Sequence, residues 1–310
     1  MRSAHVGLAV LVAAIWGLNF VVIEVGLEDF PPLLLSALRY VLAALPLLVL
    51  RGRRPAPWRW IIAAGTAIGL VQFSLLFIGM DVGMPAGLAS VLLQTQALFT
   101  IAFAVPFLHE RIRPAQAGGV LVALAGLALV AGGLDGGATV PGFLLMLGAA
   151  AGWGAGNICV RAARPDDPVR FMTWICVVPP LPLFALSLTV EGPDDIGAAL
   201  SGLDLGGLGA VAYIAFVATT LGWAAWGSLL KRYPAAVVAP FSMLVPVFGL
   251  GSAAVLLGEP LTLRRVLATA LVVGGVMITL RASRAVGAAK PVGAAAPEPV
   301  ASMSGGRAAA

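Results

Sequence analysis

Apolar runs of transmembrane length recur along the whole chain, and this repetition constrains the fold more than any other feature. Each run has roughly 18–24 residues, which at 1.5 Å per helical residue is long enough to cross a hydrocarbon core about 30 Å thick. The predicted spans are 5–25, 32–50, 60–80, 87–107, 115–133, 141–162, 170–190, 205–228, 235–257 and 264–281. The first run is too long for a signal-peptide core and has no small-residue cleavage site behind it, so we expect a retained helix. The sequence therefore predicts an all-α integral membrane protein with ten transmembrane helices.

The composition agrees with this class and argues against a soluble protein. Hydrophobic residues make up 60% of the chain and charged residues only 11%, against about 25% charged residues in ordinary soluble domains. The 38 Gly and 22 Pro are typical of packed membrane helices, whose backbones approach closely at small residues. The net charge of +5 does not indicate nucleic acid as a partner, because the cationic side chains stand in short loops between apolar runs.

The distribution of Lys and Arg predicts the orientation. If the N-terminus is cytoplasmic and the ten helices alternate, 16 of the 19 Lys and Arg residues fall on the cytoplasmic side. The three others are Arg39, within the second helix, and Arg264 and Arg265, on the outside. By the positive-inside rule, both termini are expected in the cytoplasm of a bacterial cell, with the protein in the inner (plasma) membrane. Residues 285–310 are rich in Ala, Gly, Pro and Ser and are predicted to be a disordered cytoplasmic tail.

The two halves of the chain resemble each other. Features of the first half recur in the second: the WGLN stretch at 16–19 as WGAGN at 153–157, and Pro85 and Glu110 as Pro234 and Glu259, both at an offset of 149 residues. This offset spans five helices, an odd number, so the halves must have opposite orientations in the membrane. Inverted repeats are a signature of secondary transporters that bind their substrate near the midplane. We therefore expect two five-helix repeats, 1–137 and 138–284, although an old duplication with a purely structural role is the alternative.

Five long segments in order resemble the EamA-type drug/metabolite transporter superfamily. They are WGLNFVVIEVGL (16–27), PPLLLSALRYVLAA (31–44), GMPAGLASVLLQTQALFT (83–100), AFVATTLGWAAWGSLLKRY (215–233) and APFSMLVPVFGLGSAAVLLGEPLT (239–262). Within the superfamily the chain is most similar to bacterial O-acetylserine/cysteine exporters. The resemblance implies a ten-helix carrier that exports small cysteine-pathway metabolites and related amino acids. One departure is Glu24, which stands where that subfamily is expected to have a basic residue and leaves the preferred substrate charge open.

Arg39 is the only basic residue deep within a predicted helix. An ionisable side chain at the bilayer centre costs about 2.5–3.5 kcal/mol on insertion scales, which makes it a candidate for function. Its planar guanidinium group is suited to binding a substrate carboxylate. The alternatives are a structural pair with Glu24 or Glu28, or extension of the side chain to the outer interface.

Uncharged polar side chains within the spans are the other candidates for substrate binding. They are Asn19 and Asn157, which are related by the repeat, together with Gln72 and Gln94. At 100° per residue, Gln96 would point about 200° away from Gln94, so one of the two is expected to bond to a neighbouring helix. Hydrogen bonding between helices is the alternative role for the whole group.

Aromatic residues within the apolar runs are a further set of candidates. Trp16, Trp153 and Tyr213 lie inside predicted spans and are candidates for lining the substrate cavity, with ordinary helix packing as the alternative.

Three acids and one proline are candidates for gating or coupling. Glu110 and Glu259 end the fourth and ninth helices, each beside basic residues, and are expected to form gate or loop salt bridges. Glu24 is the best-placed acid for proton coupling. Pro246 lies within the ninth helix, where a proline frees a carbonyl and permits a hinge.

Nothing in the sequence indicates an enzyme. The two histidines, His5 and His109, form no nucleophile–base or metal-ligand pattern with other residues, and no Walker motif is present. We therefore expect no catalytic residue, no metal and no cofactor. The expected partners are a small-molecule substrate and the lipid bilayer, and a homodimer is left open. Three functions are retained: an exporter of the O-acetylserine/cysteine class, a broader exporter of drugs, nucleobases or amino acids, and a non-transporting membrane assembly subunit.

Overall fold

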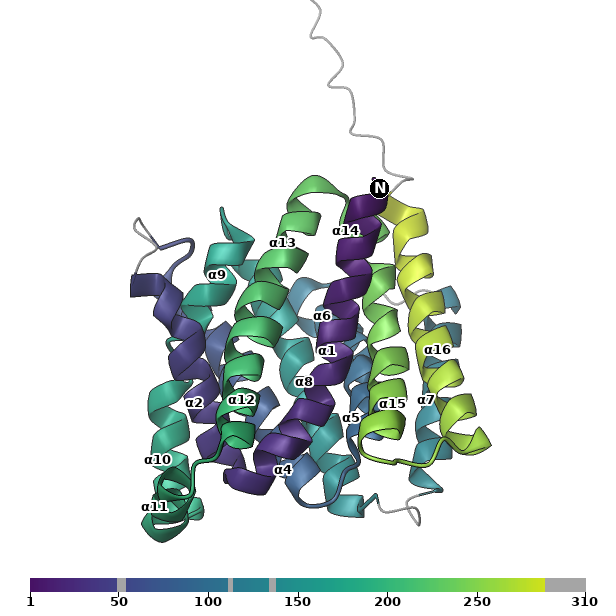
Figure 1. Ribbon diagram of the computed structural model, residues 1–310. Coiled ribbons are helices and arrows are strands. Elements are labelled where there is room, and N and C mark those ends of the chain that lie inside the picture. Colours follow the sequence, from purple (N-terminus) through teal and green to yellow (C-terminus); the bar gives the residue numbers. More distant parts are fainter. Residues whose placement is uncertain (49–53, 111–113, 134–137, 288–310) are drawn as a thin grey trace, which may run out of the picture.

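A computed structural model describes residues 1–48, 54–110, 114–133 and 138–287. Long helices run roughly parallel through one bundle in these residues (Figure 1). The first half contains α1 (Ser3–Asp29), α2 (Pro32–Ala44), η1 (Leu45–Leu48), α3 (Trp58–Ala64), η2 (Gly65–Gln72), α4 (Phe73–Asp81), α5 (Ala86–Leu92), η3 (Leu93–Thr95), α6 (Gln96–Leu108) and α7 (Pro114–Ala131). The second half contains α8 (Val140–Ala163), α9 (Pro168–Ile175), α10 (Pro180–Val190), α11 (Pro193–Ser201), α12 (Leu205–Ala212), η5 (Tyr213–Leu221), α13 (Gly222–Arg232), α14 (Ala235–Val238), η6 (Ala239–Leu244), α15 (Val245–Leu256) and α16 (Leu263–Gly287).

These elements join end to end into the ten expected membrane crossings. Within the described residues, nine helical segments are long and apolar enough to span a bilayer, and Pro32–Leu48 is a shorter apolar helix. The all-α class and the ten-helix count are thus confirmed. Helix α16 continues to Gly287, and the rest of the predicted tail lies outside the described residues.

Proline and short polar side chains set several helix starts. Pro32 and Pro168 begin α2 and α9, where the missing N–H of proline costs nothing. The carboxylate of Asp167 accepts hydrogen bonds from the amides of Val169 and Arg170, at 3.1 and 3.3 Å, and so caps α9.

The inverted repeat is visible in the irregular parts of the helices. The third crossing contains a π-helical stretch, η2, and the eighth contains another, η5, at a matching place one half-chain later. The fourth and ninth crossings both contain 3₁₀ segments, η3 and η6. In η5 the hydroxyl groups of Thr219 and Thr220 donate to carbonyls five residues earlier, at 2.7 and 3.0 Å, which suits the wider π turn.

Two glycines allow close crossings of long helices, and the repeat relates them. A Cβ on Gly17 of α1 would lie 2.5 Å from Phe248 Cβ of α15, and a Cβ on Gly154 of α8 would lie 2.7 Å from Phe99 Cβ of α6. Neither position has room for a larger residue, so the first and sixth crossings pack against the ninth and fourth in the same way.

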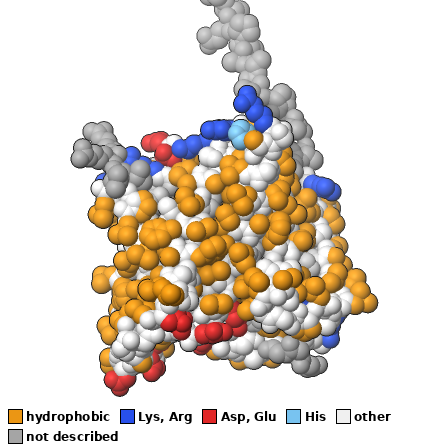
Figure 2. Space-filling model, viewed as in Figure 1, with side chains coloured by type: hydrophobic (Ala, Val, Ile, Leu, Met, Phe, Trp, Pro, Cys, Tyr) orange, Lys and Arg blue, Asp and Glu red, His pale blue; other side chains and the backbone are white. Residues whose placement is uncertain are grey.

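Charge separates the two ends of the bundle. Lys and Arg gather at the end that holds the N-terminus, which we call the basic end, and acids gather at the opposite end, which we call the acidic end (Figure 2). Apolar side chains cover the surface between them, as expected of a protein that contacts lipid there.

Candidate functional site

Arg39 is buried at the centre of α2 with no acidic partner among the described residues. Its side chain is 2% exposed, so it does not extend to the interface. Its Nε donates to Thr219 Oγ1 of η5 at 2.9 Å, and its guanidinium carbon lies 3.5 Å from the centre of the Phe73 ring. The ion pairs of the described residues involve other side chains, so the pairing with Glu24 or Glu28 considered from the sequence is absent there. A neutral hydroxyl and an aromatic face hold this charge instead.

Polar atoms without hydrogen bonds occur on the same face of α2 as this arginine. Ser36 Oγ, Arg39 Nη1 and Tyr40 OH are buried and unpartnered, and the spacing of these residues puts them on one face of α2. We call Ser36, Arg39, Tyr40 and Thr219 the Arg39 cluster. A buried unsatisfied polar group costs about 1–3 kcal/mol, more when it is charged. The cluster is therefore a place where a polar ligand or water would be strongly favoured.

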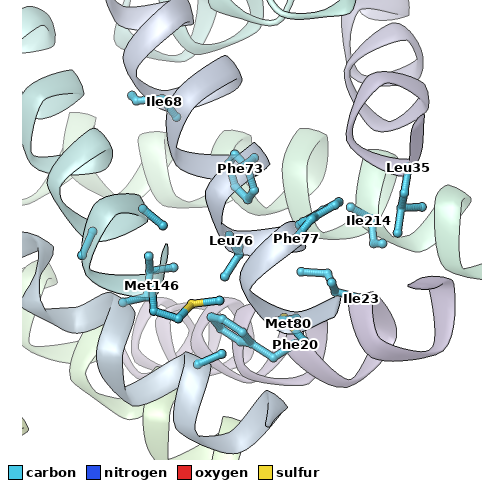
Figure 3. Close-up of a cluster of buried hydrophobic side chains, with 14 of the residues drawn as sticks. Phe20, Ile23, Leu35, Ile68, Phe73, Leu76, Phe77, Met80, Met146 and Ile214 are labelled. Carbon is cyan, nitrogen blue, oxygen red and sulfur yellow. The ribbon is translucent and has the colours of Figure 1, made fainter. Parts of the chain in front are cut away.

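An apolar layer closes the cluster on the side of the acidic end. Leu35, Phe77 and Ile214 are each fully buried, and each lies about one turn nearer that end than Arg39, Phe73 or Thr219 on the same crossing. Figure 3 shows Phe77, Ile214 and Leu35 drawn close together, with Ile23 nearby. This layer separates the buried charge from the acidic end.

A small cavity adjoins the cluster on another side. Its volume is about 20 Å³ and its lining includes Thr219, Cys176, Trp223 and Ala43, which leaves room for about one water molecule. Thr219 thus receives the hydrogen bond from Arg39 and also borders this cavity. The cluster as a whole is occluded.

The predicted polar residues do not all meet at one place. Gln72, at the end of η2, is fully buried, and both polar atoms of its amide lack partners; it precedes Phe73, which contacts Arg39. Asn19 on α1 is 8% exposed, and its Oδ1 is also unpartnered. These two residues retain unused hydrogen-bonding capacity.

Asn157 and the two glutamines of the fourth crossing bond to other helices. Asn157 Nδ2 donates to Gln96 Oε1 at 2.9 Å and to Thr100 Oγ1 at 3.1 Å. Gln94 Nε2 donates to the Ser242 carbonyl at 3.0 Å. The sequence led us to expect a bond to a neighbouring helix from one of Gln94 and Gln96, and both form one. The 100° rule fails here, since η3 turns through about 120° per residue.

The aromatic candidates are engaged in packing and hydrogen bonds. Trp16 Nε1 donates to the Ala218 carbonyl of η5 at 2.9 Å, and Tyr213 OH donates to the Ile15 carbonyl at 2.9 Å. The ring of Trp153 lies 6.1 Å from that of Phe73. Trp16 and Tyr213 therefore join the first crossing to the eighth, while Trp153 reaches the aromatic ring beneath Arg39.

Glu259 closes the acidic end as a helix cap. It accepts a hydrogen bond from the Gly87 amide at the start of α5 at 3.1 Å and pairs with Arg265 at 2.9 Å. The side chains of this pair are only 14% and 9% exposed. Arg265 is one of the basic residues beside Glu259 in the sequence, and the helix cap adds a link between the two halves of the chain.

Glu110, the repeat counterpart of Glu259, has a different and more open partner. It pairs with Arg161 at the basic end, and both side chains are about half exposed, at 49% and 47%. The basic residues beside Glu110 in the sequence are Arg111 and Arg113, which lie outside the described part of the chain. The two repeat-related acids thus differ in burial.

Glu24 and Pro246 complete the predicted set. Glu24 Oε2 is buried on α1 without a hydrogen-bond partner. Pro246 is buried at the start of α15, at the junction of the ninth crossing's 3₁₀ and α-helical parts. This proline lies within the ninth crossing, at the point where its helix type changes.

Sequence reasoning missed two residues that organise the site. Thr219 was one of many hydroxyl residues in apolar runs, and no signal in the sequence paired it with Arg39. Glu191 is the other: its carboxylate accepts hydrogen bonds from the amides of Leu33 and Leu34, at 2.5 and 3.1 Å, and from Ser187 Oγ at 2.6 Å. It therefore caps the helix that contains Arg39, and only the fold reveals this.

Two inverted five-helix repeats around a buried polar centre define a membrane transporter of the inverted-repeat class. The chain belongs to the EamA-like transporter family, which matches it twice, at residues 4–132 and 140–281. This multi-pass membrane protein is 42% identical over 279 residues to a "Probable amino-acid metabolite efflux pump" of Salmonella typhimurium, covering 88% of this chain and 93% of the relative. A protein of Escherichia coli with the same name is 40% identical over 280 residues, with the same coverage.

More distant proteins share the architecture. A "Probable terminal-alkyne amino-acid exporter" of Streptantibioticus cattleyicolor is 28% identical over 288 residues, covering 90% of this chain and 94% of the relative. A solved structure described as "Crystal structure of protein" aligns with a TM-score of 0.61 at 23% identity, covering 92% of this chain and 98% of the other. That likeness concerns the fold alone.

Proposed function

We propose that this protein exports small amino-acid metabolites of the O-acetylserine/cysteine class across the bacterial inner membrane, with both termini in the cytoplasm. The observation that most supports this is the burial of Arg39 beside a neutral hydroxyl rather than an acid. Relatives at 42% and 40% identity are named amino-acid metabolite efflux pumps. The gathering of Lys and Arg at the N-terminal end favours the proposed orientation (Figure 2).

Arg39 is the proposed anchor for the substrate carboxylate. Its Nη1 lacks a partner and would donate to a carboxylate oxygen, while Thr219 and Phe73 hold the guanidinium plane in place. Gln72 and Asn19 offer unpartnered amide atoms for the remaining polar groups of the substrate. A small zwitterion suits this mixture of one cation and several neutral groups.

Alternating access follows from the inverted repeat and the two differently closed ends. At the acidic end, carboxylates of the second half cap helices of the first, through Glu259 on α5 and Glu191 on α2. Opening toward the periplasm requires these caps to separate, together with the apolar layer of Leu35, Phe77 and Ile214. Pro246, at the change of helix type, is the proposed hinge of the ninth crossing.

Glu24 is the proposed coupling residue. Its buried, unpartnered oxygen lies on the crossing that also contains Asn19. If proton exchange drives export, Glu24→Gln removes the dependence of export on a pH gradient while leaving downhill efflux. Persistence of that dependence in the variant would assign coupling to another group.

The test is an efflux assay with analogues that differ by one charged group. Cells that overproduce the protein are loaded with cysteine, O-acetylserine, cysteamine (no carboxylate) or 3-mercaptopropionate (no amine), and export is timed. Arg39→Lys keeps the charge but loses the planar fork, and Arg281→Gln, on the exposed surface of α16, is the matched control at equal abundance.

We expect export of cysteine and O-acetylserine and little export of cysteamine. Loss of a charge-assisted hydrogen bond costs about 1.5–3 kcal/mol, so Arg39→Lys should raise KM roughly 10- to 150-fold, with the control unchanged. Export of cysteamine at the rate of cysteine would refute the carboxylate anchor. Export of other amino acids or drugs in preference would favour the broader exporter, and no export of any solute would favour the assembly subunit.

A further inference from the structure

A large pocket opens at the basic end, away from the Arg39 cluster. Its volume is about 1020 Å³, and it lies between the segment before α3 and the connection from α8 to α9. The residues that matter here are Arg54 and Trp58 on one side and Arg164 and Trp174 on the other. Asp166 is the one carboxylate in the lining described, so the charged side chains of the lining are predominantly cationic.

Helix α9, which contributes Trp174 to the pocket lining, has N–H donors without acceptors in the described part of the chain. Trp174 Nε1 is buried and has no acceptor among the described residues, and neither do Nε and Nη2 of Arg170. Arg170 precedes Trp174 by four residues, so the two side chains share a face of α9. All three unpartnered atoms are N–H donors. A ligand with several acceptor oxygens and negative charge would satisfy them.

Aromatic contacts join the two sides of the pocket. The rings of Trp58 and Trp174 meet edge to face at 5.6 Å, and the guanidinium carbon of Arg54 lies 5.2 Å from the Trp58 ring. Trp58 is itself 44% exposed. Tryptophan in such a position is typical of the headgroup level of a membrane.

The surface that continues from the pocket is apolar. Val177 and Leu181, on the same crossing as Trp174 and spaced from it by three and seven residues, are 45% and 81% exposed. Leu48, at the end of η1, is 83% exposed. A site for an anionic headgroup that borders exposed aliphatic side chains matches a phospholipid better than a free anion. The acyl chains of a phospholipid would cover those side chains, whereas a free anion would leave them uncovered.

We propose that this pocket binds the headgroup of an anionic phospholipid, with the acyl chains along the exposed side chains of the seventh crossing. Arg54 and Arg164 face the headgroup phosphate, and the indole N–H of Trp174 donates to one of its oxygens. This site is separate from the proposed substrate site and does not depend on the transported solute.

Lipid binding is measured by native mass spectrometry on the full-length protein in detergent. The probes are phosphatidylglycerol, cardiolipin, phosphatidylethanolamine and, as a free anion, inorganic phosphate. The variants are the Arg54→Gln/Arg164→Gln double variant and Trp174→Phe, which removes one N–H and keeps an aromatic ring. Arg281→Gln, an exposed arginine of α16 also at the basic end, is the control.

We expect the two anionic lipids to bind at least tenfold more tightly than phosphatidylethanolamine. The double variant should lose most of this preference, Trp174→Phe should weaken binding several-fold, and the control should bind as wild type does. Equal binding of all three lipids, or an unchanged preference in the double variant, would overturn the proposal. Inorganic phosphate that competes with phosphatidylglycerol at equal concentration would identify a free-anion site instead. If the double variant does not fold, the test rests on Trp174→Phe, and unchanged binding of the anionic lipids to that variant would overturn the proposal.

Discussion

Alanine at Gly17 or Gly154 should destabilise the bundle at two places that the inverted repeat makes equivalent. A Cβ at these positions would lie 2.5 Å from Phe248 Cβ and 2.7 Å from Phe99 Cβ, whereas carbon atoms in contact prefer about 3.5–4.0 Å. Each helix pair must therefore separate by roughly 1 Å. Backbone atoms of the partner helix also lie within 2.9 Å of each new Cβ, so rotation of one side chain gives no relief. Such overpacking costs about 1–3 kcal/mol.

The measurement is the free energy of unfolding in mixed micelles, with two helical glycines that face open space as controls. Gly7 of α1 and Gly251 of α15 have nothing within 4 Å of an added Cβ. Alanine there should be neutral or stabilise by about 0.5–1 kcal/mol, because glycine is a poor helix former. We expect losses of similar size for Gly17→Ala and Gly154→Ala. A free energy of unfolding for either variant equal to those of the two controls would refute the close crossing.

Three further predictions concern single contacts. Thr219→Val removes the bond to Arg39 Nε and should raise KM for export several-fold at normal abundance, measured by efflux kinetics. Glu191→Gln should lower the free energy of unfolding by about 1 kcal/mol, the usual effect of losing a good helix cap, and an unchanged value would contradict its capping role. Asn157→Leu leaves the Gln96 acceptor without its donor and should destabilise the protein by about 1–2 kcal/mol without changing substrate preference; altered preference in a substrate panel would place Asn157 in the pathway instead.

The helix count was predictable, whereas the departures from regular helix were not. Runs of apolar residues define membrane crossings because water is absent from the bilayer core and every backbone group must bond within a helix. The π turn at Tyr213–Leu221 leaves no such mark, because the same apolar side chains suit either helix type. The 3₁₀ turn between Gln94 and Gln96 was equally hidden, so the relative directions of these two side chains were inferred from a regular helix.

The candidate site was predictable in kind but not in its partners. Arg39 stood out because a lone cation among apolar residues is costly. Its contacts with Phe73 and Thr219 join segments far apart in the chain, and only the fold brings them together. Asn157 was as good a candidate for substrate binding as Asn19, yet its amide donates a hydrogen bond to the neighbouring Gln96. Sequence alone does not separate a polar group that awaits a ligand from one that already has a partner.

The paired π segments also have a bearing on the buried charge. A π turn holds one residue more than the α-helix would, and it is the kind of defect that survives where it is used. Both halves have it on the third helix of their five, at Gly65–Gln72 and at Tyr213–Leu221. Phe73, which follows the first of these segments directly, and Thr219, within the second, are the two side chains that hold Arg39. The widened turns of both halves therefore lie where each half contacts the one buried charge.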